Sequence, residues 1–178
     1  DLVRSRGLGD VYKRHVLEGS SELISREDRD IADSVREVLE QKGIVFRLNA
    51  RVQSVKDSDV IYRDAVTGEE HQLHADAILL ATGWRPNTAG LNLAAAGVEV
   101  NERGAIVVDD YLQTTNPKIH AIGDVKGGLQ FTYISLDDYR ILREDLFGAG
   151  ERKVSDRDPV SYSVFIDPPL SRIGLSEA

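Results

Sequence analysis

The chain has 178 residues and a formal net charge of −8, with 41% hydrophobic and 29% charged residues, as in a globular protein of one domain or parts of two. This acidic balance provides no basic surface for a polyphosphate backbone, which argues against a nucleic-acid partner. Cysteine is absent, which excludes disulfides and thiolate metal sites within these residues, and no apolar run approaches the roughly 20 residues of a membrane span. We therefore expect a cytoplasmic protein with no membrane partner.

The first 14 residues show neither strand alternation nor a helical apolar stripe, and they form an atypical amino-terminal stretch. Gly7 and Gly9 are similar to the start of a dinucleotide-binding fingerprint. However, Tyr12 stands where the third glycine belongs, and no strand precedes the glycines. A phosphate-binding loop is therefore not predicted here.

Residues 15–18 are typical of a short strand that ends on an acid, Glu18. An acid at this place in a nucleotide-binding unit accepts hydrogen bonds from both ribose hydroxyls. Because its carboxylate would repel a ribose 2′-phosphate, Glu18 favours NADH over NADPH. The alternative, equally supported by these residues alone, is a surface glutamate at a strand end.

A helix is expected next, from a capping pattern at Ser25 and Asp28 to a left-handed terminator at Gly43. A parallel strand at residues 44–46 should follow, and then three antiparallel strands at residues 51–56, 60–63 and 71–73. His71 and His74 would lie on opposite faces of the last strand, so no metal site is expected.

Residues 77–81 are continuously apolar, which predicts a strand covered on both faces and ending at Thr82 and Gly83. A short helix at residues 91–96 and a strand at residues 105–108 are expected after it. Residues 114–124 contain a further short strand, from Ile119 to Ile122, followed by Gly123 and Asp124. The glycine would let another molecule approach the backbone and the carboxylate could accept a hydroxyl, although a simple turn is the alternative.

The pattern from residue 131 to residue 147 is helical, with Ile134 and Ile141 in its apolar stripe. Asp137 and Asp138 are expected on the solvated face of this helix. Residues 151–158 are charged, which predicts an exposed linker, and residues 161–166 predict a strand.

Four motifs now occur in the order and spacing of a known family. They are residues 16–18, residues 81–83, residues 114–124, and residues 164–169 with residues 173–175. On these motifs, residues 15–178 resemble the pyridine nucleotide-disulfide oxidoreductases (class I, FAD-dependent), which include dihydrolipoamide dehydrogenase and glutathione reductase. Residues 127–140 are similar to the RclA-like and mercuric reductase-like branch of that family.

The resemblance implies an α/β fold with Rossmann-like, three-layer ββα domains for FAD and NAD(P). Residues 15–80 would be the carboxy-terminal half of the NAD(P)-binding domain, and residues 81–150 the returning part of the FAD-binding domain. Residues 151–178 would be a linker and the start of an α+β dimerisation domain. The chain would be an internal fragment of a homodimer, without the two glycine loops and the redox-active cysteine pair of the family, and inactive alone.

The resemblance also assigns cofactor roles but no catalytic residue. Asp124 is similar to the aspartate that binds the ribityl hydroxyls of FAD, and Gly123 would keep the backbone clear for it. The residues implied to bind FAD or NAD are Glu18, Ala81, Thr82, Gly83, Gly123, Asp124, Phe131 and Thr132.

Phe131 and Thr132 would begin a helix whose positive end faces the flavin. The implied enzyme passes hydride from NADH to flavin and on to a disulfide, a metal ion or another acceptor. The alternative is a non-catalytic nucleotide-binding or interaction remnant of the family.

Overall fold

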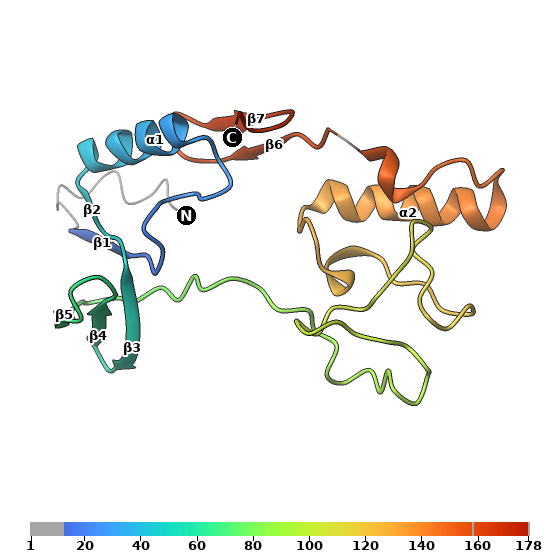
Figure 1. The fold of residues 1–178 in the computed structure, drawn as a ribbon, viewed down its shortest axis with the longest axis horizontal. Helices are drawn as coiled ribbons and strands as arrows, with labels where there is room; N and C mark the ends of the chain where they lie inside the picture. Colours follow the sequence, from blue (N-terminus) through green and yellow to red (C-terminus); the bar gives the residue numbers. More distant parts are fainter. Residues whose placement is uncertain (1–12, 158, 178) are drawn as a thin grey trace. The chain divides into compact units, whose positions relative to one another are not determined.

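The computed structural model describes residues 13–157 and 159–177. It contains two compact units, drawn in Figure 1. The first unit consists of the described residues up to Leu80 together with those from Tyr162 onward, and the second is Ala81–Ser161. Most of the atypical amino-terminal stretch, residues 1–12, lies outside the described residues.

The first unit begins with a strand–helix–strand motif. Strand β1 (Arg14–Leu17) pairs in parallel with β2 (Ile44–Arg47), so that His15 lies opposite Val45. The connection is helix α1 (Arg29–Gln41), which buries Ala32 and Val35. This confirms the predicted parallel pair and its crossover helix.

The ends of α1 follow the predicted chemistry only in part. Gly43 has a φ of +84° and its N–H donates to the Glu40 carbonyl at 2.9 Å, as expected of a left-handed terminator. At the other end, Asp28 is the residue before the helix, but no side chain caps it. The Asp28 carboxylate instead accepts a hydrogen bond from the Glu177 N–H at 2.8 Å. The predicted capping pattern is therefore wrong.

The three predicted antiparallel strands are present as β3 (Ala50–Lys56), β4 (Asp59–Asp64) and β5 (Glu70–His74). They form one sheet in the order β3-β4-β5, with a bulge in β3 between Val52 and Ser54. The last strands of the unit, β6 (Tyr162–Val164) and β7 (Leu170–Arg172), form a hairpin.

The second unit has a small core with little regular strand structure. Val98, Ile106 and Ala121 form its apolar centre. The strands predicted at residues 105–108 and 119–122 are wrong, because only isolated bridges occur there, and residues 91–96 form turns instead of a helix. Local side-chain bonds explain the difference: Asn101 and Asp109 each accept two backbone N–H groups, which bends the chain between the bridges.

The continuously apolar residues 77–81 do not form the predicted strand. No described strand pairs with them, and Leu79 is 88% exposed. A strand needs a neighbour to bond its backbone, and these residues have none within the described part of the chain. These residues therefore have the sequence pattern of a strand buried on both faces, but the described part of the chain does not bury them.

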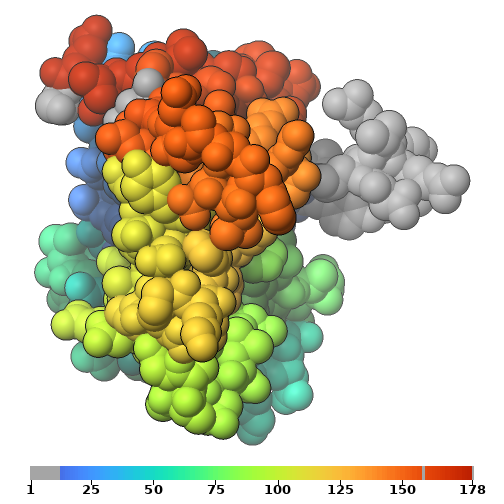
Figure 2. All heavy atoms as spheres, turned by 90° about the vertical axis from the view of Figure 1, so that its right-hand side faces the viewer, coloured from blue at the N-terminus to red at the C-terminus, as the bar shows by residue number. Residues whose placement is uncertain are grey.

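Helix α2 (Thr132–Phe147) dominates the second unit and confirms the predicted helix. Before it lies a short 3-10 helix, η2 (Gly123–Lys126), and after it another, η3 (Val154–Arg157). Figure 2 shows the orange segment after α2 lying against the yellow part of the same unit. Two bonds fix this contact: the Val154 N–H donates to the Asp110 carbonyl at 2.9 Å, and the Ser155 hydroxyl to the Asp110 carboxylate at 2.8 Å.

Candidate functional site

The Gly123–Asp124 pair begins η2, directly after the extended residue Ile122. Gly123 has a φ of +72°, a conformation that favours glycine. A Cβ at this position would lie 3.3 Å from the Ser135 Oγ of α2. In the structure this glycine lets the loop pack closely against the helix. Its expected role of keeping the backbone clear for a ligand stays a prediction.

Asp124 is exposed on this loop. Its backbone carbonyl accepts the Gly127 N–H at 3.0 Å and so closes the η2 turn. The loop is short, and α2 begins at Thr132, after Phe131. A carboxylate presented to solvent from a closed turn is available to accept hydrogen bonds from hydroxyl groups.

The amino end of α2 has no side-chain cap and no acidic residue in its first turn. Its first backbone N–H groups therefore keep the partial positive charge of a helix start, without a carboxylate of the helix to offset it. Phe131 and Tyr133 stack here, with ring centroids 5.2 Å apart and planes 9° apart. The Tyr133 hydroxyl donates to the Ser161 carbonyl, and burial raises the pKa of Tyr133.

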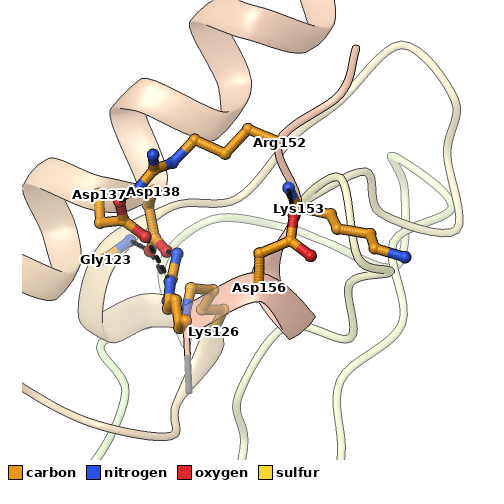
Figure 3. A network of polar contacts seen from close by, with 8 residues as sticks. Gly123, Lys126, Asp137, Asp138, Arg152, Lys153 and Asp156 are labelled. Atoms are coloured by element: carbon orange, nitrogen blue, oxygen red, sulfur yellow. Dashed lines mark hydrogen bonds and ion pairs between the residues drawn. The ribbon is translucent and has the colours of Figure 1, made fainter. Parts of the chain in front are cut away.

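Behind the loop lies a buried carboxylate, Asp138 of α2, which is 0% exposed (Figure 3). Its Oδ2 accepts the Gly123 N–H at 2.7 Å and lies 3.4 Å from the Lys126 Nζ. Its Oδ1 accepts a hydrogen bond from the Arg157 guanidinium. The charge is therefore paired on both oxygens, which a buried carboxylate requires.

The neighbouring carboxylate, Asp137, belongs to the same network. The Arg157 Nε donates to it at 2.6 Å, and the Arg152 guanidinium donates to its other oxygen. Burial raises the pKa of Asp137, but the hydrogen bonds and charges of Arg157 and Arg152 outweigh it, so this pKa lies below its ordinary value. The network contains two carboxylates and three cations, so its formal charge is +1.

These contacts correct two predictions. Asp137 and Asp138 do not lie on a solvated face, because both are buried. Residues 151–158 are not an exposed linker throughout, because the Arg157 side chain is only 11% exposed and is ion-paired to both carboxylates. The first error was avoidable: Ile134, Asp137, Asp138 and Ile141 follow the i, i+3, i+4, i+7 spacing of one helix face. The arginine partners could not be read from spacing.

In the first unit, Glu18 directly follows β1, at the carboxyl end of the parallel pair. Its Oε1 accepts the Ser20 N–H at 2.8 Å, and its backbone bonds to Arg47 and Ala50, each at 2.9 Å. The side chain is half-buried. Open α/β sheets generally bind nucleotides at the carboxyl ends of their strands. An acid at that position can accept hydrogen bonds from ribose hydroxyls.

The remaining predicted site residues, Ala81, Thr82 and Gly83, begin the second unit and are exposed, with a φ of +96° at Gly83. The structure thus brings Gly123, Asp124 and the start of α2 together within one unit. Within the described residues, no group of three or more potential ligands could hold a metal ion. No helix of that same part has the length and apolar character that a membrane crossing requires.

Comparisons with known proteins show the family of the chain. The sequence profile described as pyridine nucleotide-disulphide oxidoreductase matches residues 6–138. The chain is 52% identical over 162 residues to the probable pyridine nucleotide-disulfide oxidoreductase RclA of Escherichia coli (strain K12), covering 91% of this chain and 36% of that protein. It is 35% identical over 164 residues to a mercuric reductase of Lysinibacillus sphaericus, covering 91% of this chain and 30% of that protein.

A solved structure, the Cu(II) complex of the HOCl-induced flavoprotein disulfide reductase RclA from Escherichia coli, matches with a TM-score of 0.83 and 51% identity. It covers 92% of this chain and 36% of that one. The chain belongs to the pyridine nucleotide-disulphide oxidoreductase family and has its Rossmann-type α/β fold. This confirms the predicted fold class and the resemblance to RclA and mercuric reductase. The chain spans about a third of the length of these relatives.

Proposed function

We propose that the chain supplies part of the FAD site and part of the NAD site of an FAD-dependent NAD(P)H oxidoreductase. The observation that carries this proposal is the Gly123–Asp124 loop in a chain of this family: it presents an exposed carboxylate a few residues before the uncapped start of α2. Such a loop fits a polyhydroxylated chain, and an uncapped helix start fits an electron-rich ring edge.

In this proposal Asp124 accepts hydrogen bonds from the ribityl hydroxyls of FAD. The N–H groups that follow Phe131, beginning with Thr132, provide a positive field toward the flavin. Ala81, Thr82 and Gly83 would run close to the cofactors. Gly83 has no side chain to obstruct this approach, and its positive φ is a conformation that favours glycine. When bound, the flavin supplies the hydride acceptor chemistry; the residues of this chain bind and orient it.

The first unit would bind the nicotinamide nucleotide. Glu18 would accept the ribose hydroxyls, and its carboxylate would disfavour a 2′-phosphate, so the preferred donor is NADH. We propose that residues 15–80 belong to the NAD(P)-binding domain and residues 81–150 to the FAD-binding domain. Residues 151–178 would be the start of a dimerisation domain, preceded by a linker that Arg152 and Arg157 anchor to α2. The whole protein would be a cytoplasmic homodimer that delivers electrons to a disulfide, a metal ion or another acceptor.

The experiment is to purify the whole protein and record its visible absorption spectrum. We expect bound flavin, and we expect NADH added without oxygen to bleach its absorbance faster than NADPH does. A colourless protein that binds no added FAD would refute the proposed function. It would instead favour a non-catalytic nucleotide-binding or interaction remnant, for which the exposed Leu79, Leu80 and Trp84 are the supporting observation.

A further inference from the structure

Both ends of the η2 turn are held by a single buried oxygen atom. The Asp138 Oδ2 accepts the N–H of Gly123, the first residue of η2, at 2.7 Å, and lies 3.4 Å from the Nζ of Lys126, its last residue. The Lys126 side chain is only 9% exposed, and Figure 3 shows Gly123 and Lys126 both close to Asp138. Asp124 lies between these two anchors and is exposed.

The anchor itself is fixed by the segment that follows α2. Arg157 of η3 donates to both Asp138 and Asp137, so the aspartate that holds the loop is tied to a residue 19 positions later. A buried carboxylate with charged partners on both oxygens has little freedom to rotate, because any other orientation leaves a donor unpaired in a poorly solvated place. The loop is therefore positioned by α2 and η3 together.

We infer that Asp138 is a positioning residue for the flavin site: by holding both ends of the Gly123–Lys126 turn, it presents the Asp124 carboxylate to the ribityl chain. This inference rests on the proposed function. Asp138 is buried and acts through Asp124. Replacing Asp138 lowers the fraction of molecules whose loop is in the conformation that binds FAD. The apparent dissociation constant of FAD rises in inverse proportion to that fraction.

Asp137 offers a matched control, because it is the neighbouring residue, is also buried and shares Arg157, yet the hydrogen bonds of its carboxylate come from Arg152 and Arg157 and not from η2. In the whole protein, the Asp138→Asn and Asp137→Asn variants keep side-chain volume and remove one negative charge each. We would prepare apo-protein of each and measure the dissociation constant of FAD by the quenching of flavin fluorescence. The unfolding midpoint of each variant is measured alongside.

We expect Asp138→Asn to bind FAD at least about tenfold more weakly than wild type, since a hydrogen bond to a charged acceptor and an ion pair are both lost. Asp137→Asn should change the affinity for FAD by less than about threefold, even if its unfolding midpoint falls as much as that of Asp138→Asn. Equal affinity of Asp138→Asn and wild type, or equal losses in the two variants, would overturn the inference. If wild type itself binds no FAD, it is the proposed function that fails.

A double variant separates positioning from general loosening of the structure. If Asp138 acts through Asp124, the Asp124→Ala/Asp138→Asn variant binds FAD no more weakly than Asp124→Ala alone; additive losses would contradict the inference. Should Asp138→Asn fail to fold, Lys126→Gln decides, because it removes one anchor and leaves the Gly123 bond. We expect it to weaken FAD binding by about threefold or more, and an unchanged affinity would overturn the inference.

Discussion

Arg157 and Arg152 provide a direct test of the ion-pair network, because both bind Asp137 but differ in burial. The Arg157 side chain is 11% exposed and also bridges to the fully buried Asp138, whereas the Arg152 side chain is 49% exposed. Removing one partner of a buried pair costs about 3–5 kcal/mol, because the remaining charge is left uncompensated. An exposed pair is worth about 0–1 kcal/mol.

We therefore expect Arg157→Ala to lower the free energy of local unfolding of α2 by about 3 kcal/mol. This is the low end of the range, because Lys126 still compensates part of the Asp138 charge. Arg152→Ala should lower it by less than about 1 kcal/mol. Native-state hydrogen exchange of the α2 amides in the whole protein measures this local opening directly. Equal effects of the two substitutions, or a loss below about 1 kcal/mol for Arg157→Ala, would refute the account of the network.

Three further predictions concern single residues. The pKa of Asp137 is lower in the folded protein than in the unfolded chain, where it is about 3.9. The ionised Asp137 carboxylate therefore stabilises the fold above about pH 3.9, and this stabilisation is lost as the pH falls through the lower pKa of the folded protein. The free energy of local α2 unfolding should decrease over this pH range, and Asp137→Asn should abolish the decrease. Gly123→Ala combines a φ of +72° with a 3.3 Å contact to Ser135 and should cost about 1–2 kcal/mol by denaturant unfolding, whereas Gly90→Ala, at a glycine with open space around it, should stay within about 0.5 kcal/mol. In steady-state assays, Glu18→Gln should raise the KM for NADH and reduce the ratio of kcat/KM for NADH to kcat/KM for NADPH. If that ratio is unchanged, Glu18 does not bind the ribose.

Much of the fold follows from local pattern. The apolar spacing of α1 and α2, the terminator Gly43 and the three antiparallel strands were all predictable, because period and turn residues are properties of neighbouring positions. The strands predicted in the second unit were wrong for the same local reason: Asn101 and Asp109 bind nearby backbone N–H groups, and these bonds outweigh a short apolar run.

The contacts that surround the candidate site are of another kind. Asp138 is bound by Gly123, 15 residues earlier, and by Arg157, 19 residues later, and no sequence period connects these positions. The expectation of a solvated face for Asp138 was wrong, although the helix spacing of its neighbours Ile134 and Ile141 was compatible with the apolar face; no spacing could identify its partners. Residues 77–81 show the converse case, since a strand pattern needs a pairing neighbour, and the described part of the chain contains none for it.

The central claim is that the Gly123–Asp124 loop binds the ribityl chain of FAD. Equilibrium titration of the apo-form of the whole protein with FAD tests it most directly, comparing wild type with Asp124→Ala and with a control at an exposed aspartate of the other unit, Asp76→Ala. Loss of hydrogen bonds to a charged acceptor predicts that Asp124→Ala binds FAD roughly 10- to 100-fold more weakly, with Asp76→Ala unchanged. Full affinity in Asp124→Ala would contradict the claim.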